Sequence, residues 1–443
     1  MTSGLTSPFR VLHVLGDRPF AEVGQPVLAV ADEGRGLLAV AGEPGFAGAA
    51  TAGVYGTGDL GCRAVLRTRF PVHALAFHPT EPLLAVGTGE YDGGYFFEGE
   101  LFLLDWETGA TTSLIEHDLG RQVLGLTWLD GQALRVLMAP PDDWKDRKAH
   151  VEGHAAVVRR PDWRAVAPRS LTGADLAGPR MPAPRTDGED AARRVLSALG
   201  PDWEPRRHVL AVEELLDGAV LATLDREEED GPEPPVCTAL ADGLLIQHRT
   251  TVYVDRHERL RIRYGSRDYV NRAPGAGRKP KPRWLSVRSP EGKGVQPLFP
   301  FSWEPGETHF PGPGVETDDG DLVHAGTVYD GRGLQPGGSF VVRRAATDGA
   351  PRWVFRTDHV ATDLDTGPDT GPDTGPDTGP DTAYLAYRNG ELLALDLHDG
   401  TLRWRHRLTV AGVPAVPTAL TVTGPGRLLV GTADGRVLDC ATA

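Results

Sequence analysis

The sequence predicts an all-β chain built from repeated four-stranded units. Residues 72–118 form one complete unit, because short apolar runs alternate with polar residues and are separated by Pro and Gly turns. Strand starts recur at Val27, Val72 and Val123, which are 45 and then 51 residues apart. Gly 55 and Pro 37 together make 92 of 443 residues, as expected when many short strands each need a turn. This pattern predicts a single β-propeller of four-stranded blades.

Composition limits the classes of partner. Hydrophobic residues make up 40% of the chain and charged residues 24%, which is typical of a soluble protein with a large core. The net charge of −15 opposes general binding to nucleic acid or to an anionic membrane. Residues 1–16 lack a basic start followed by a long apolar run, and we expect a cytoplasmic, monomeric protein. Three dispersed cysteines, Cys62, Cys237 and Cys440, predict buried thiols rather than disulfides or a zinc site.

The first three units are regular and the middle of the chain is not. In the third unit, the fourth strand is expected near Ala165. Residues 171–206 form a predicted surface insert with one short helix, in which Thr186 and Glu189 make a capping box and Gly200 ends the helix. Residues 209–264 supply strands for one blade, with room for extra hairpins.

The last unit, near the C-terminus, ends after three strands. An apolar segment at 9–15, FRVLHVL, is available to pair as its fourth strand and close the ring, so the predicted propeller spans 9–443. We expect seven blades, with eight as the next possibility. Residues 365–382, DTGPDTGPDTGPDTGPDT, predict an exposed low-complexity loop within a late blade, and a calcium site there is the less favoured interpretation.

Two groups of repeats carry a family resemblance. VHALAFHPTEPLLAVGTG and LFLLDWETG resemble the WD-repeat family, with Asp105 at the position of the family's aspartate. The residue before it is Leu104 instead of Trp, and no Gly-His pair precedes Val72. Residues 394–404 and, more loosely, 341–353 resemble the quinoprotein-like propeller repeat. The resemblance therefore implies a WD-repeat or quinoprotein-like β-propeller of bacterial type, and such propellers host many unrelated activities.

Quinoprotein dehydrogenases bind a quinone with calcium, so the resemblance raises the question of a cofactor. The chain has no adjacent-cysteine pair of the kind that many of those enzymes place over their cofactor. We therefore expect the repeat geometry without the cofactor, and no resident metal. His150 and His154 in HVEGH do not match a helical zinc motif, because Gly153 disfavours the helix that would align them.

Long connections between second and third strands predict a recognition face. They fall at 43–51, 90–98, 140–153 and 329–338, and loops that join second and third strands open on the same face of a propeller. Aromatic rings beside acidic residues are typical of protein and peptide sites. The predicted partner-binding residues are Tyr91, Asp92, Tyr95, Phe96, Phe97, Glu98, Asp142, Asp143 and Trp144. The alternative is that Phe96 and Phe97 fold inward and plug their own loop.

Charge is segregated in the middle of the chain. Residues 256–288 contain eleven Lys or Arg against two acidic residues, whereas 213–233 contain nine acidic residues and one Arg. The favoured interpretation is that the two segments neutralise each other on adjacent strands. The alternative is an anion-binding or single-stranded nucleic-acid patch made of Arg278, Lys279, Lys281 and Arg283.

The sequence-based hypothesis for function is a non-catalytic scaffold. Its face of long loops would recognise another protein or peptide. The alternatives are a propeller enzyme with a polar site at the central channel and anion binding through 256–288. No nucleophile with a neighbouring base is recognisable in the sequence, so no catalytic residue is predicted.

Overall fold

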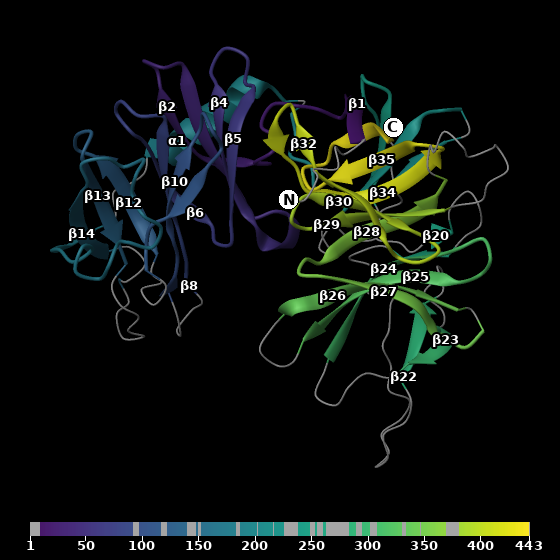
Figure 1. Cartoon of the computed structure of the whole chain (residues 1–443). Coiled ribbons are helices and arrows are strands. Elements are labelled where there is room, and N and C mark those ends of the chain that lie inside the picture. Colours follow the sequence, from purple (N-terminus) through teal and green to yellow (C-terminus); the bar gives the residue numbers. More distant parts are fainter. Residues whose placement is uncertain are drawn as a thin grey trace. The chain divides into compact units, whose positions relative to one another are not determined.

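In the computed structural model the chain is all-β with a single described α-helix, α1 (Asp187–Leu199) (Figure 1). The described residues are 9–442 apart from 92–96, 117–121, 140–147, 149–151, 183–186, 202, 216, 226–237, 249–252, 255–259, 263–282, 289–294, 302–307, 330–333, 346 and 369–380. They form two compact units: the 18–206 unit, and the split unit, in which the residues up to 17 join those from 207 onward.

The 18–206 unit holds three four-stranded antiparallel sheets in chain order. The first contains β2 (Pro26–Asp32), β3 (Leu37–Gly42), β4 (Ala50–Gly56) and β5 (Cys62–Thr68). The second contains β6 (Val72–Phe77), β7 (Leu83–Thr88), β10 (Leu101–Asp105) and β11 (Thr111–Ser113). The third contains β12 (Val123–Trp128), β13 (Ala133–Met138), β14 (Glu152–Arg159) and β15 (Arg180–Pro182).

The fourth strand of the third sheet differs from the sequence prediction. It is β15, and the prediction of a strand near Ala165 is wrong. Trp163 explains the difference, because its side chain is only 2% exposed and packs edge to face on Trp128, with ring centroids 5.1 Å apart. The chain therefore turns inward at Trp163 to fill the core before it returns to pair with β14.

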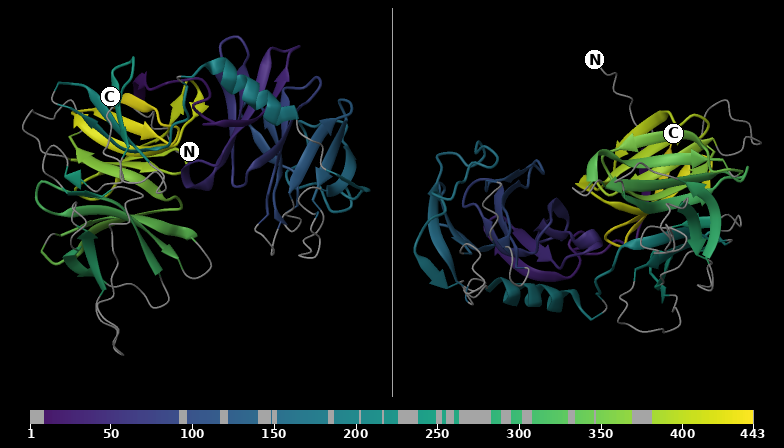
Figure 2. Two further views of the ribbon diagram at one scale, coloured as in Figure 1. Left: turned by 180° about the vertical axis from the view of Figure 1, so that it is seen from behind. Right: turned by 90° about the horizontal axis from the view of Figure 1, so that it is seen from below.

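Helix α1 covers one face of the first sheet (Figure 2). The opposite face of that sheet packs against β6 of the second sheet, whose other neighbour is β12. The helix presents Ala191, Ala192, Val195 and Leu199, spaced as one side of a helix, to Val40 and Tyr55. It ends before Gly200, which has φ +88°, as expected of a glycine that terminates a helix.

The split unit holds four further sheets. One contains β16 (Val209–Glu214), β17 (Val220–Leu224), β19 (Leu244–His248) and β18 (Thr238–Ala239). The next has six strands, β20 (Tyr253–Val254), β21 (Leu260–Ile262), β24 (Thr308–Glu316), β25 (Leu322–Tyr329), β26 (Leu334–Arg344) and β27 (Pro351–Thr357). Then come β28 (Ala361–Gly367), β29 (Thr382–Tyr387), β30 (Glu391–Asp396) and β31 (Leu402–Arg407). The last contains β34 (Pro417–Gly424), β35 (Arg427–Thr432), β36 (Val437–Thr442) and β1 (Phe9–Leu15). Two short pairs, β22 (Arg283–Arg288) with β23 (Val295–Phe301) and β32 (Thr409–Val410) with β33 (Val413–Pro414), complete the unit.

The N-terminal strand belongs to the last sheet. β1 pairs antiparallel with β36, from Phe9 opposite Thr442 to Leu15 opposite Val437. At the end of β1, Arg436 is 3% exposed and contacts Asp434 at 2.7 Å and Asp17 at 3.3 Å. This pairing is the one expected for segment 9–15, and the ion pairs hold the residue at which the chain leaves the split unit.

The sheet that starts with β16 departs from the simple up-and-down order. β17 and β19 run parallel, with Val220 opposite Leu244, and β18 lies at the outer edge beside β19. The chain therefore forms the edge strand β18 before it forms β19, which lies between β18 and β17. The turn between β18 and β19 contains Gly243, which has φ +86°. A short turn signal in the sequence does not distinguish these two orders.

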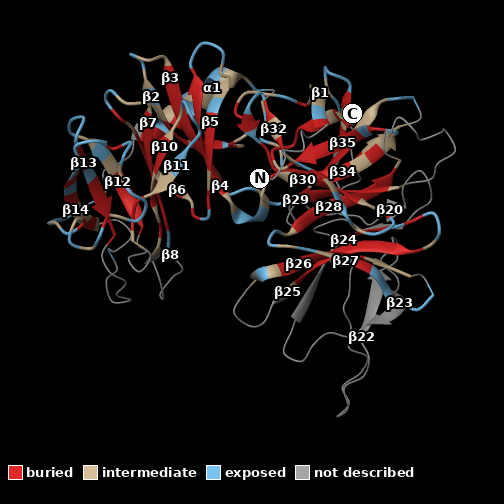
Figure 3. Cartoon of the chain, viewed as in Figure 1, coloured by how far each residue is buried: buried red, intermediate tan, exposed pale blue. Residues whose placement is uncertain are grey.

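Buried polar side chains join the first strands of three sheets in the split unit. Figure 3 shows β28, the first strand of one of these sheets, in the colour of buried residues. Asp363 and Asp365 on β28 are at most 1% exposed and accept hydrogen bonds from the Leu420 amide at 2.7 Å and the Val422 amide at 2.9 Å of β34. Thr421 on β34 donates to the Val212 carbonyl of β16 at 2.6 Å. Asp365, Thr366 and Gly367, assigned to the low-complexity loop from the sequence, thus lie in a buried strand.

Among the described residues, no helix is both long enough and apolar enough to cross a bilayer.

Candidate functional site

Only part of the predicted recognition face lies within the described residues. Tyr91, Phe97 and Glu98 lie on the two-stranded pair β8 (Glu90–Tyr91) and β9 (Phe97–Glu98). Glu90 is opposite Glu98, and Tyr91 is opposite Phe97. The remaining predicted partner-binding residues lie outside the described part: Asp92, Tyr95, Phe96, Asp142, Asp143 and Trp144.

The β8–β9 hairpin continues the second and third strands of its sheet beyond the first strand. β6 pairs with β7 as far as Val72 opposite Thr88. Past that point the Thr88 amide donates to the Glu100 carbonyl at 2.9 Å, and β8 then pairs with β9. The connection at 90–98 therefore begins and ends as a paired ribbon that extends from the sheet.

The root of this hairpin is fixed between the second and third sheets. The Gly89 amide donates to the Pro71 carbonyl at 3.0 Å. His73 Nε2 lies 2.9 Å from the Gly89 carbonyl oxygen and 3.1 Å from Gln122 Nε2. A Cβ on Gly89 would lie 2.1 Å from Gln122 Cγ, so the close approach requires glycine. These contacts therefore hold the root of the hairpin at Gly89.

Charged residues flank the same face. Arg69 and Glu98 form an ion pair at 3.3 Å with side chains 78% and 47% exposed, which contributes little to stability. In the third sheet, Glu152 contacts Lys148 at 3.1 Å and Arg180 at 3.1 Å. Exposed charges of this kind are available to a partner because little free energy is lost when they exchange contacts.

Only one histidine of the pair at 150 and 154 lies within the described residues. His154 lies on β14, and its Nδ1 is 2.9 Å from the Gly178 carbonyl oxygen, while His150 lies outside the described part. Among the described residues, no three His, Cys, Asp or Glu side chains are placed to hold a metal ion.

The anion-binding hypothesis falls on residues that are largely undescribed. Arg278, Lys279 and Lys281 lie outside the described part, and Arg283 is the first residue of β22, where only the backbone is described. The acidic segment 213–233 is likewise described only in part.

The opposite end of the sheets in the 18–206 unit is joined turn to turn. Arg35 donates to the Glu81 carbonyl at 2.8 Å and to the His78 carbonyl at 2.6 Å. His78, 1% exposed, in turn lies 2.9 Å from the Gly131 carbonyl oxygen and packs on Trp128. These contacts link the first turns of three successive sheets, and they assign His78 a structural role.

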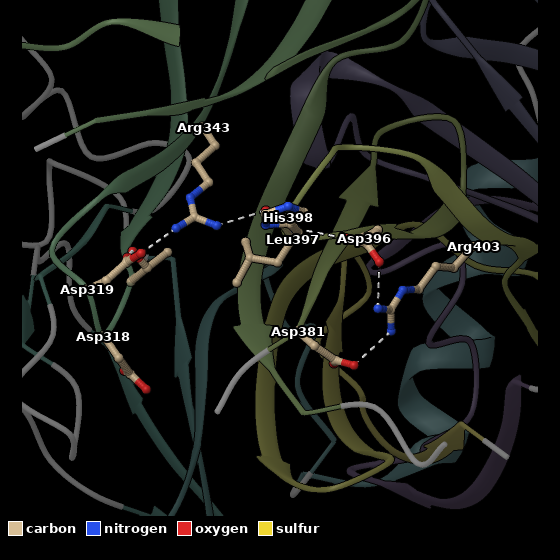
Figure 4. Close-up of a pocket in the computed structure, with 9 residues that line it drawn as sticks. Asp318, Asp319, Arg343, Asp381, Asp396, Leu397, His398 and Arg403 are labelled. Atoms are coloured by element: carbon tan, nitrogen blue, oxygen red, sulfur yellow. Dashed lines mark hydrogen bonds and ion pairs between the residues drawn. The ribbon is translucent and has the colours of Figure 1, made fainter. Parts of the chain in front are cut away.

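A polar cavity of about 450 Å³ lies in the split unit, between the β24–β27 strands and the β28–β31 sheet (Figure 4). It is lined by Thr317, Asp318, Asp319, Arg343, Asp381, Asp396, Leu397, His398 and Arg403. Most of these residues come from the β24–β25 turn, the start of β29 and the β30–β31 turn, which open on the side opposite to second-to-third connections. Arg343 lies on β26 and Arg403 on β31. No sequence pattern predicts this cavity, because its residues are spread over 87 positions and follow no motif.

Two arginines organise the cavity walls. Arg343 is 11% exposed and donates to Asp321 at 2.8 Å, to Asp319 at 2.5 Å and to the Leu397 carbonyl at 3.0 Å. Arg403 contacts Asp396 at 2.8 Å and Asp381 at 3.2 Å. Each guanidinium is therefore shared between two carboxylates.

Asp396 shows the electrostatic balance at this site. Burial alone would raise its pKa, but hydrogen bonds from Arg403 and from the His398 and Asp399 amides outweigh burial, so its pKa lies below the ordinary value. The same carboxylates raise the pKa of Arg403 against the effect of its burial. Both groups are charged near neutral pH.

Comparisons with known proteins identify no family. No protein-family model matches the chain, and no curated protein matches it in sequence. Among solved structures, the computationally designed Ika8 protein is 13% identical, with a TM-score of 0.27, over 98% of this chain and 100% of that one. The β-propeller domain of Myceliophteria thermophila Cps50 (Swd1) is 10% identical, with a TM-score of 0.26, over 98% and 100%. BamB from Moraxella catarrhalis is 14% identical, with a TM-score of 0.23, over 93% and 83%. The all-β assignment rests on the sheets described above.

Proposed function

We propose that this chain is a non-catalytic binding module that recognises another protein or peptide through its second-to-third-strand connections. The observation that carries the proposal is the β8–β9 hairpin, whose paired ends extend the segment EYDGGYFFE from the second sheet. Its root is held by Gly89, His73 and Gln122. A rigidly rooted loop loses less entropy on binding than a free one, so it is suited to recognition.

The proposal includes a propeller architecture of seven blades with WD-repeat or quinoprotein-like units. Six four-stranded sheets and one six-stranded sheet among the described residues support a count of seven. The pairing of β1 with β36 supports closure of the last blade by the N-terminal strand. A cytoplasmic location and a monomeric state belong to the same proposal.

The buried carboxylates on the first strands of the described sheets favour a role in recognition over a role in catalysis. The buried carboxylates Asp363 and Asp365 accept backbone hydrogen bonds from a neighbouring sheet. A general acid or base must instead reach a substrate. Their role in joining sheets supports a scaffold and favours the binding module over a channel enzyme.

Site-specific photocrosslinking tests the assigned face. A photoreactive amino acid is placed at Glu98, on the hairpin, and in a matched protein at Glu107, an exposed residue in the third-to-fourth turn of the same sheet. We expect a discrete crosslinked partner from position 98 and none from position 107. Equal capture at both positions would contradict the proposed face.

Removal of the aromatic rings gives an independent measure. The Tyr95→Ala/Phe96→Ala/Phe97→Ala protein should lose the partner by more than tenfold in affinity, because buried aromatic anchors dominate interfaces. A Val354→Ala/Leu402→Ala protein removes exposed apolar side chains, 50% and 42% exposed, from outer strands of the split unit and should keep it. Circular dichroism confirms that both proteins remain folded. Unchanged affinity in the triple variant would mean that the rings fill their own loop.

A further inference from the structure

The polar cavity between the β24–β27 strands and the β28–β31 sheet has surplus negative charge. Among the residues that the structure describes, four carboxylates line it, from Asp318, Asp319, Asp381 and Asp396, against the two guanidiniums of Arg343 and Arg403. Asp321 and Arg352, which form an ion pair beside Arg343, leave this difference unchanged. The described carboxylates and guanidiniums of the lining therefore sum to a formal charge of −2.

The two arginines are occupied by existing contacts. Arg343 is held by Asp319, Asp321 and the Leu397 carbonyl, and the Trp353 indole N–H donates to the same carbonyl at 2.9 Å. Arg403 is held by Asp381, Asp396 and the Thr382 hydroxyl at 2.7 Å. An anionic ligand would have to displace carboxylates from these arginines, whereas a cationic ligand would not.

Two polar groups on the lining remain uncommitted. The Asp318 carboxylate and the His398 imidazole are exposed and have no side-chain partner among the described residues. Figure 4 shows Asp318 turned away from Arg343, and His398 between the two arginine clusters. One acceptor and one ring are thus free to contact a ligand.

We propose that this cavity binds a guanidinium or ammonium group, presented by a basic side chain of a peptide. A volume of about 450 Å³ lies within the range of small-ligand sites. Asp318 accepts a charge-assisted hydrogen bond from the cation, and the surplus carboxylate charge selects against neutral and anionic groups. The site is separate from the β8–β9 hairpin and goes beyond the function proposed for that face.

Calorimetric titration of the full-length protein tests the charge requirement. The probes are N-acetyl-arginine methylamide, its neutral isostere N-acetyl-citrulline methylamide, and inorganic phosphate. We expect the arginine probe to bind at least tenfold more tightly than the citrulline probe, and phosphate not to bind. Equal affinity for the two amides, or binding of phosphate alone, would overturn the proposal.

A pair of matched variants localises the binding. Asp318→Asn removes the free carboxylate on the cavity lining, and Glu316→Gln removes an exposed carboxylate two residues away and outside it. We expect a loss of about two- to fivefold in arginine-probe affinity for Asp318→Asn, as for an exposed ion pair, and none for Glu316→Gln. An equal loss of affinity in both variants, or no loss in Asp318→Asn, would mean that the cation binds elsewhere. Photocrosslinking from position 98 is expected to be unchanged in Asp318→Asn, so failure of either proposal leaves the other intact.

Discussion

The turns 105–110 and 396–401 have the same backbone hydrogen bonds but different surroundings. In one, the Asp105 amide donates to the Ala110 carbonyl at 2.9 Å and the Gly109 amide donates to the Asp105 carbonyl at 2.8 Å. In the other, the corresponding distances from Asp396 and Gly400 are 2.8 Å and 2.9 Å. Each aspartate also accepts two nearby amides, and each glycine has a positive φ, +72° and +76°. Two segments that resemble different repeat families thus form turns of the same type.

The difference between them lies in what packs on the glycine. A Cβ on Gly109 would meet nothing within 4 Å. A Cβ on Gly400 would lie 2.8 Å from the ring of Trp353, which belongs to the neighbouring sheet. The local sequence therefore determines the turn, and a distant tryptophan determines whether a neighbouring sheet packs on its glycine.

The largest effect is expected from alanine at the two glycines. Gly109→Ala should destabilise the protein by about 1 kcal/mol, the cost of a left-handed conformation for a residue with a Cβ. Gly400→Ala should cost about 2–4 kcal/mol, because overpacking against Trp353 adds to the same backbone term. Urea unfolding of the full-length proteins measures both. Equal losses would show that Trp353 moves aside without cost.

A smaller effect is expected when the indole N–H is removed but the ring is kept. Trp353→Phe loses the hydrogen bond to the Leu397 carbonyl, 2.9 Å long, and should cost about 1 kcal/mol. Trp106→Phe is the matched control in the other turn, because the buried Trp106 Nε1 has no hydrogen-bond partner among the described residues. Urea midpoints should fall for the first variant and change less for the second. The reverse order would refute the assigned role of Trp353.

Acid should weaken both turns. For Asp105, as for Asp396, burial raises the pKa. Hydrogen bonds from nearby amides and from an arginine lower the pKa by more than burial raises it, so the pKa in the folded protein lies below the ordinary value. A lowered carboxyl pKa stabilises the fold above the unfolded pKa, near 4, and this contribution is lost as pH falls through the folded pKa. Urea midpoints measured from pH 6 to pH 3 should therefore fall less steeply in Asp105→Asn and Asp396→Asn than in the parent protein. Identical slopes would contradict the assignment.

The sequence predicts the parts of this structure that depend on neighbouring residues and not those that depend on distant contacts. The Thr108-Gly109 turn, the strands around it and the pairing role of segment 9–15 depend on local signals, namely alternation and turn residues. The contact of Trp353 with Gly400 joins residues 47 positions apart in different sheets, and no local signal reports it.

The start of the low-complexity segment is a second feature that the sequence did not predict correctly, because it belongs to the buried strand β28. Asp363 and Asp365 alternate with apolar residues in ATDLDTG, but the last three of these residues read as the first copy of the DTG repeat. Buried, they accept hydrogen bonds from the Leu420 and Val422 amides. The alternation of residues before the repeat was the available signal for a strand. An Asp in a strand is normally predicted to be exposed, and its burial can be predicted only when the backbone amides that it accepts from are known.

The smallest effect is expected at the arginine that pairs with Asp105. Arg164 donates to Asp105 at 2.7 Å from a side chain that is 43% exposed, so Arg164→Ala should cost about 0.5 kcal/mol. In the second turn the partner, Arg403, lies in the same sheet, is 26% exposed and is also held by Asp381, so Arg403→Ala should cost more. Because salt screens exposed pairs most, the effect of Arg164→Ala should vanish at high ionic strength, while that of Arg403→Ala persists. Urea midpoints at low salt and in 1 M salt distinguish the two pairs, and equal salt dependence would mean that both behave as surface pairs.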